Sequence, residues 1–133
     1  MGYGTLTGFA IKTLGAADHT YVTSSEGHIW PCWGRSKGGQ KICEGTGNID
    51  QAECLSRVNS RAGIKYGRTG VCHQTANRIL LTAKVDVARA AAAGKSFILY
   101  GKYGLDLRRF RQYDPSARPW PELVRCRRDH VHK

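Results

Sequence analysis

The chain has 133 residues, a formal net charge of +11 and five cysteines, with 41% hydrophobic and 23% charged residues. This length supports one domain with its own core, and the composition excludes a disordered chain. No apolar run approaches the ~18 residues of a membrane span, and residues 1–15 lack the regions of a signal peptide. We therefore expect a single, monomeric catalytic domain over residues 1–133, with no membrane span and no cleavable leader.

The positive charge is spread along the chain and is densest at its end. Residues 102–133 hold nine Lys or Arg against four Asp or Glu. The arginines of this tail include Arg108, Arg109, Arg111, Arg125, Arg127 and Arg128. Such a surface attracts nucleic acid, anionic lipid or bacterial wall polymer, and a solvated basic face explains it equally well. We expect a basic, loosely packed tail from about residue 105, where prolines are frequent.

The first half of the chain predicts an antiparallel sheet. Residues 3–14 form a β-favouring run punctuated by glycines, and residues 18–23 and 28–33 form two more runs around Ser24-Ser25-Glu26-Gly27. This second pattern is typical of a hairpin. Residues 34–48 hold five glycines and few apolar residues, so we expect a loop there.

The second half predicts mainly helices. Asp50 is an expected N-cap for a helix over residues 50–61, and 64–70 is an expected loop. The spacing of Cys72, Ala76, Ile79, Leu80 and Ala83 predicts one apolar helix face that begins at Cys72. After this helix we expect a further helix over 85–93, a strand over 96–100 and a turn over 100–104. The expected fold class is α+β, with an antiparallel sheet packed against helices.

The cysteines indicate an oxidising compartment. Their spacing matches no zinc pattern, so we expect no metal and no cofactor. An odd number leaves at least one thiol when the others pair, although a cytosolic protein with reduced thiols has the same sequence. Cys43 and Cys54 are close enough in sequence to form a staple, and Cys126 could tie the tail to the core. The sequence leaves the connectivity among Cys32, Cys43, Cys54 and Cys126 open.

Cys72 is the candidate nucleophile. A helix N-terminus stabilises a thiolate, and its first N–H groups can hold an oxyanion. The preceding loop, Gly67-Arg68-Thr69-Gly70, allows close backbone approach. A buried core cysteine is the alternative reading. Cys32, in Trp30-Pro31-Cys32-Trp33-Gly34, is the rival nucleophile, but no helix begins there.

His19 is the candidate base for Cys72, because a sheet can hold its ring rigidly. His73 follows Cys72 directly and points about 100° away on a helix, and His130 and His132 lie in the polar tail. If the hairpin closes with an even-numbered loop, His19 and His28 share one sheet face, and His28 can orient His19. A loop of three residues reverses that assignment.

A histidine in Asp18-His19-Thr20-Tyr21-Val22 followed by a cysteine in Gly70-Val71-Cys72-His73-Gln74 resembles the circularly permuted papain-like enzymes of the NlpC superfamily. Together with small size, basicity and the absence of a leader, it looks like the type VI secretion amidase effectors. The likeness covers about residues 15–104. In papain-like enzymes that are not permuted the cysteine precedes the histidine, and that order would favour Cys32.

The resemblance implies a cysteine amidase that hydrolyses an amide bond in bacterial peptidoglycan peptides. It also implies a secreted antibacterial toxin that acts in the periplasm of a target bacterium, with peptidoglycan as substrate and a cognate immunity protein as partner. Two alternatives remain open. One is a basic nucleic-acid-binding protein or nuclease toxin, and the other is a structural module stapled by cysteines.

Overall fold

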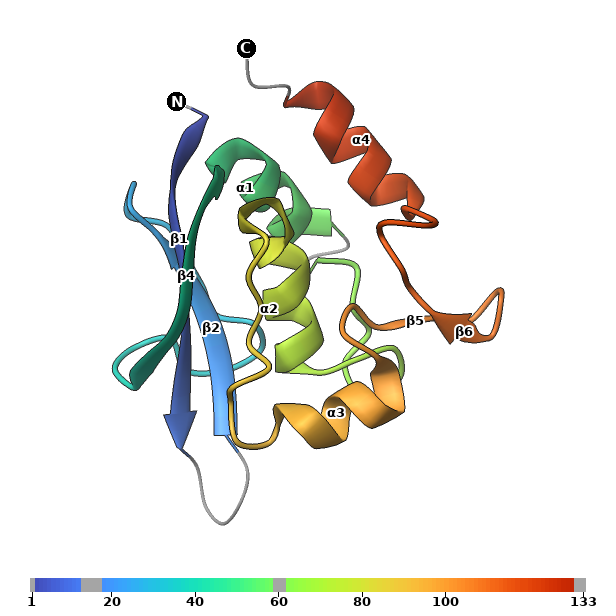
Figure 1. The fold of residues 1–133 in the computed structure, drawn as a ribbon, viewed down its shortest axis with the longest axis horizontal. Helices are drawn as coiled ribbons and strands as arrows, with labels where there is room; N and C mark the ends of the chain where they lie inside the picture. Colours follow the sequence, from blue (N-terminus) through green and yellow to red (C-terminus); the bar gives the residue numbers. More distant parts are fainter. Residues whose placement is uncertain (1, 13–17, 59–61, 131–133) are drawn as a thin grey trace.

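The computed structural model describes residues 2–12, 18–58 and 62–130, which form an antiparallel sheet with helices on one side of it (Figure 1). The chain is therefore an α+β protein, as expected. None of the helices in these ranges has the length and apolarity needed to cross a lipid bilayer.

The sheet has four strands in the order β3-β2-β1-β4. Their bounds are Tyr3–Lys12 for β1, Asp18–Ser24 for β2, Ile29–Trp30 for β3 and Gln40–Asn48 for β4. All neighbouring strands are antiparallel. The predicted first strand and the predicted hairpin are confirmed. Because β3 pairs with Val22 and Thr23, no strand of the described residues lies along the outer edge of β2 before Val22.

The predicted loop over residues 34–48 is wrong for its second half, which forms β4. The glycines of β4 serve close packing. A Cβ at Gly45 would lie 2.7 Å from the Ala83 carbonyl oxygen, and one at Gly47 would lie 2.8 Å from the Ala83 nitrogen. These contacts let the strand pass directly beside the end of the helix layer, so the glycines mark contact between layers rather than a turn.

Two helices cover the inner face of the sheet. They are α1 (Ile49–Arg57) and α2 (Cys72–Leu80), which continues into the 3₁₀ turn η2 (Leu81–Ala83). The N-cap of α1 is Asn48 rather than the expected Asp50, because the Asn48 side chain accepts the Gln51 N–H at 3.1 Å. The predicted helix beginning at Cys72 is confirmed, and its apolar face lies in the core with strand residues such as Leu6 and Val22. The predicted helix continued to residue 61, and its last part, 59–61, lies outside the residues that the structure describes.

The predicted helix over 85–93 and the predicted strand over 96–100 are both wrong. Residues before 93 form turns, because two buried side chains take backbone N–H groups that a helix would use. Asp18 accepts the N–H groups of Ala91 and Ala92 at 2.6 and 3.1 Å, and Asn77 accepts that of Val87 at 2.9 Å. The chain then forms the helix α3 over Ala93–Tyr100. The expected turn after Tyr100 is present.

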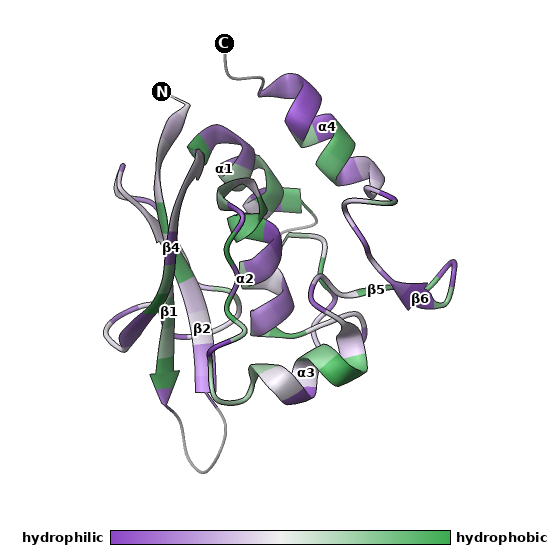
Figure 2. Cartoon of the chain, in the orientation of Figure 1, coloured by the Kyte–Doolittle hydropathy of each residue, from purple (hydrophilic) through white to green (hydrophobic). Residues whose placement is uncertain are grey.

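The tail differs from the loose segment we expected. It forms the short strands β5 (Leu105–Asp106) and β6 (Arg111–Gln112) and the helix α4 (Pro121–Asp129). A second core cluster joins this tail to α1 through Leu55, Val58, Trp120, Leu123 and Cys126. Figure 2 shows that α4 and β6 are otherwise largely hydrophilic.

One disulfide links the helix α1 to the C-terminal tail. It joins Cys54 on α1 to Cys126 on α4, with a Cα–Cα distance of 5.8 Å. The expected link from Cys126 to the core is therefore present, whereas the suggested pair of Cys43 and Cys54 is wrong. Cys43 and Cys72 are thiols.

Candidate active site around Cys72

Cys72 is the first residue of α2, and its side chain is 6% exposed. Gln74 accepts the Val71 N–H through its side-chain oxygen at 2.9 Å, which fixes the start of the helix. The N–H groups of the first helical turn have no carbonyl partner within the helix. The Cys72 side chain points to β2, where Thr20 lies beside it. Cys72 therefore joins the start of α2 to the middle of the sheet.

The surroundings of the Cys72 sulfur act on its pKa in both directions. Burial raises the pKa of the thiol, and the negative charge of Asp18 adds to that rise. Interactions with the backbone and side chain of Thr20 and with the His73 N–H lower the pKa in part. The net direction is upward, so the resting group is the thiol rather than the thiolate.

Strand β2 divides its side chains between the two faces of the sheet. Asp18, Thr20 and Val22 face the helices: Asp18 bonds to residues of the helix layer, and Val22 lies in the core. His19 and Tyr21 alternate to the other side, where Tyr21 stacks on Phe9. The Thr20 hydroxyl is fully buried and has no hydrogen-bond partner among the described residues. It lies beside the Cys72 sulfur, and its interaction with that sulfur is one of those that lower the pKa of the thiol.

His19 lies at the open edge of β2, under the loop that follows β3. Its Nε2 donates to the Pro31 carbonyl at 2.9 Å. A Cβ on Gly34 would lie 2.6 Å from the ring, so any larger residue there would displace the ring. Burial lowers the pKa of His19, while the carbonyls of Pro31 and Arg35 and the charge of Asp18 oppose this effect. The ring is therefore neutral near pH 7 and can accept a proton.

No hydrogen bond joins His19 to Cys72 in the part of the chain that the structure describes. The charge of Asp18 acts on both of them, and His19 also lowers the pKa of His73. The two side chains extend to opposite faces of β2, with Cys72 beside Thr20 and His19 beside the Pro31 carbonyl.

His73 forms a buried network that the sequence pattern did not reveal. Its Nε2 lies 3.3 Å from an Asp18 carboxylate oxygen, and its Nδ1 lies 2.9 Å from the Ser96 hydroxyl. Its side chain is 4% exposed and that of Asp18 is 3% exposed. Burial lowers the pKa of His73, and the adjacent Asp18 partly restores it. With both ring nitrogens engaged, His73 positions Asp18 between β2, α2 and α3.

His28 is not placed to orient His19, which corrects the expectation from the hairpin. Val22 pairs with Trp30, and the Ser24 N–H donates to the His28 carbonyl, so the loop has three residues rather than an even number. His28 consequently lies on the face opposite His19. Its Nδ1 lies 2.8 Å from the Ser24 hydroxyl and its Nε2 lies 3.2 Å from Glu53.

Cys32, the rival nucleophile, belongs to the core rather than to a helix start. It is 1% exposed, and its thiol donates to the Trp30 carbonyl at 3.4 Å. Cys32 and Trp33 both have positive φ, which bends the chain sharply away from β3. This bend carries the following loop towards His19 and leaves Cys32 beside the cavity described next.

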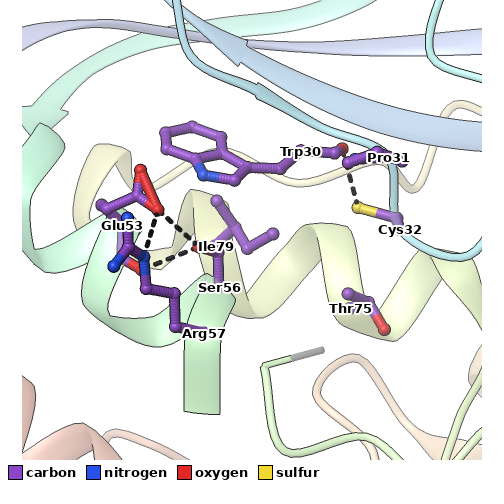
Figure 3. A pocket seen from close by; sticks show the side chains of 8 residues that line it. All are labelled: Trp30, Pro31, Cys32, Glu53, Ser56, Arg57, Thr75 and Ile79. Carbon is purple, nitrogen blue, oxygen red and sulfur yellow. Dashed lines mark hydrogen bonds and ion pairs between the residues drawn. The ribbon is translucent and has the colours of Figure 1, made fainter. Parts of the chain in front are cut away.

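A cavity of about 270 Å³ lies between β3, α1 and α2 (Figure 3). Its lining residues are Trp30, Pro31, Cys32, Glu53, Ser56, Arg57, Thr75 and Ile79. Thr75 and Ile79 follow Cys72 by one and two turns of α2, so the cavity continues along the same helix face. In the ranges that the structure describes, no three His, Cys, Asp or Glu side chains are grouped to hold a metal ion.

Sequence reasoning proposed Cys72 and His19 as site residues and assigned no role to Asp18, Thr20 or His73, which the structure places around Cys72. The signal for Asp18 and Thr20 was present, because residues alternating with His19 on a strand must face the opposite layer. Comparisons with family models, curated proteins and solved structures gave no match.

Proposed function

We propose that this protein is a cysteine hydrolase of the permuted papain-like type, with Cys72 as nucleophile, and that it cleaves an amide bond in bacterial peptidoglycan peptides. The observation that carries the proposal is the sulfur at the start of α2, next to the His73 N–H and Thr20, where the charge of Asp18 also acts on it. A chain that buried Cys72 for packing alone would not need ionisable groups around it.

The proposed reaction uses general-base activation. The Cys72 thiol gives its proton to His19, and the sulfur attacks the substrate carbonyl carbon. The oxyanion that forms accepts hydrogen bonds from the N–H groups at the start of α2. The amine leaves with the proton from His19, and water then hydrolyses the thioester. Since His19 bonds to Pro31 in this structure, the ring must turn around the open edge of β2 to reach the sulfur.

Digestion of purified peptidoglycan sacculi, with the products read by mass, tests this proposal. Cys72→Ala should lower the rate by at least about 10³-fold, and Cys43→Ala should leave it unchanged as a matched thiol control. His19→Ala should lower the rate by about 10²- to 10⁴-fold. Full activity of Cys72→Ala would refute Cys72 as nucleophile, and loss of activity in Cys32→Ala alone would transfer that role to Cys32.

The Cys54–Cys126 disulfide supports the rest of the proposal. A disulfide between distant elements suits a secreted protein that acts in an oxidising compartment, here the periplasm of a target bacterium. A toxin of this kind requires a cognate immunity protein in the producing cell. Co-expression of the wild type and of Cys72→Ala in a periplasm tests the toxicity, since only the wild type should lyse the cells.

Nucleic-acid binding is the second candidate, and the β5–β6 turn favours it. Phe110 is 89% exposed at this turn, between Arg109 and Arg111. An exposed ring flanked by arginines can stack on a base while the cations meet phosphates. Titration of a labelled single-stranded oligonucleotide tests it: binding should fall steeply with salt, weaken in Phe110→Ala and ignore Cys72→Ala.

A further inference from the structure

Helix α3 presents an aliphatic pair to the outside of the molecule. Ile98 is 84% exposed and Leu99 is 63% exposed. They follow the exposed Lys95 by three and four residues, so the three side chains form one stripe along the helix, which we call the outer face of α3. The outer stripe of a surface helix is ordinarily polar, and here it is mainly apolar. An exposed apolar patch of this kind is typical of an interaction site.

The opposite side of α3 is already used for packing. The Ser96 hydroxyl lies 2.9 Å from the His73 Nδ1, and the Tyr100 hydroxyl donates to the Gly67 carbonyl at 2.8 Å. These contacts fix the rotation of the helix, so the aliphatic pair cannot turn towards the core. The helix lies at the lower right edge of the molecule in Figure 1, and Figure 2 shows a hydrophobic stretch within it.

The surroundings of the aliphatic pair are basic. Lys95 lies one turn before the pair, and Lys102 lies in the turn after the helix. The loop that holds Gly67 beside the end of α3 adds Lys65 and Arg68, which are both exposed. Residues 87–105 contain no Asp or Glu. A surface with this charge attracts an anionic partner.

We propose that the outer face of α3 is a docking surface for an anionic lipid bilayer. The aliphatic side chains of Ile98 and Leu99 enter the boundary between headgroups and acyl chains, and the neighbouring cations meet the lipid phosphates. This docking is peripheral and uses one side of a short helix. It does not need the Cys72 thiol, so it goes beyond the proposed function and is tested separately from it.

Two other occupants fit this face less well. A nucleic acid gains little from the pair, because aliphatic side chains cannot stack on bases as aromatic rings do. A second copy of the chain would bring two molecules of charge +11 together. In addition, two side chains offer far less than the ~800 Å² per partner of a stable protein interface. An anionic bilayer uses both the charge and the aliphatic pair.

Co-sedimentation of the oxidised full chain with lipid vesicles tests the proposal. Vesicles that contain phosphatidylglycerol should bind the protein at least about tenfold more tightly than vesicles of phosphatidylcholine alone. The double variant Ile98→Ala, Leu99→Ala should bind the anionic vesicles about tenfold or more weakly than the wild type. Alanine preserves the helix propensity of α3, so this loss does not come from unfolding. Lys95→Gln should weaken binding about fivefold.

The matched control is the double variant Ile29→Ala, Val124→Ala, which removes two aliphatic side chains that are 56% and 50% exposed on β3 and α4. It should bind like the wild type. Equal vesicle binding by the α3 double variant and the wild type would overturn the proposal, because only the general attraction of a basic chain would remain. If that variant instead lost oligonucleotide binding or self-association with vesicle binding unchanged, the face would belong to a nucleic acid or to a second copy, and the proposal would equally be wrong.

Discussion

Replacement of Arg78 by methionine should destabilise the protein strongly, because this buried cation joins α2 to the tail. Arg78 is 2% exposed, and it donates to the Tyr103 and Ala62 carbonyls, each at 2.7 Å. Its guanidinium carbon lies 4.8 Å from the centre of the Tyr113 ring and 4.6 Å from that of Trp120. Methionine keeps the length and apolar stem of the side chain and removes all four interactions.

The magnitude follows from opposing contributions to the free energy of unfolding. Two hydrogen bonds from a charged donor contribute about 3–6 kcal/mol, and two desolvated cation–π contacts add about 2–4 kcal/mol. Burial lowers the pKa of Arg78 to about 10, which corresponds to an opposing cost of about 3 kcal/mol for the charged form. The net loss expected for Arg78→Met is therefore about 2–7 kcal/mol.

Urea unfolding of the oxidised protein, followed by circular dichroism, measures this loss. Arg78→Lys should lose less than Arg78→Met, since an ammonium keeps the charge but cannot form the fork to both carbonyls. Arg89→Met, a change on the exposed part of the turn before α3, is the matched control and should stay within about 0.5 kcal/mol. Equal stability of Arg78→Met and the wild type would refute the reasoning.

Three further predictions concern the disulfide, the His19 ring and the pH response. A Cys54→Ala, Cys126→Ala double variant should lose about 4 kcal/mol in a urea titration, because the loop between the two cysteines spans 72 residues; an unchanged midpoint would contradict this. Gly34→Ala should displace the His19 ring, 2.6 Å from the added Cβ, and lower the rate on sacculi while circular dichroism stays native. Burial holds the pKa of His73 below 6.5, so the native protein binds fewer protons than the unfolded chain; stability should fall as the pH drops below about 6.5, and His73→Asn should flatten this slope.

The sequence predicted the helix α2 and its start at Cys72 well, because the signals that determine a helix start are local. An apolar face at helical spacing and a preceding glycine loop decide where the helix begins. The register of the β2–β3 hairpin depended instead on one side chain. The Ser24 hydroxyl accepts the N–H groups of Glu26 and His28, each at 3.2 Å, and thereby fixes a loop of three residues. That single residue moved His28 to the face opposite His19.

The other errors came from long-range contacts that replace local preferences. The Ala-rich segment before α3 has high helix propensity, but Asp18, more than 70 residues earlier, accepts two of its N–H groups. The glycines of β4 resemble a loop until the end of the helix layer lies against them. Both cases share a cause, since the deciding partner is distant in sequence and is invisible to a pattern of neighbours.

The burial of Cys72 bears on two parts of the proposal, a nucleophilic thiol and an oxidising compartment. Burial raises the pKa of both Cys43 and Cys72, so little thiolate is present to attack the Cys54–Cys126 disulfide. The same burial excludes a preformed thiolate as the resting state of the proposed enzyme. Activation must then come with the substrate, through a base that is neutral at rest, and His19 meets that condition because burial lowers its pKa. Iodoacetamide should therefore label Cys72 slowly in the native protein, and faster labelling of Cys72 than of an unfolded control would contradict this order of events.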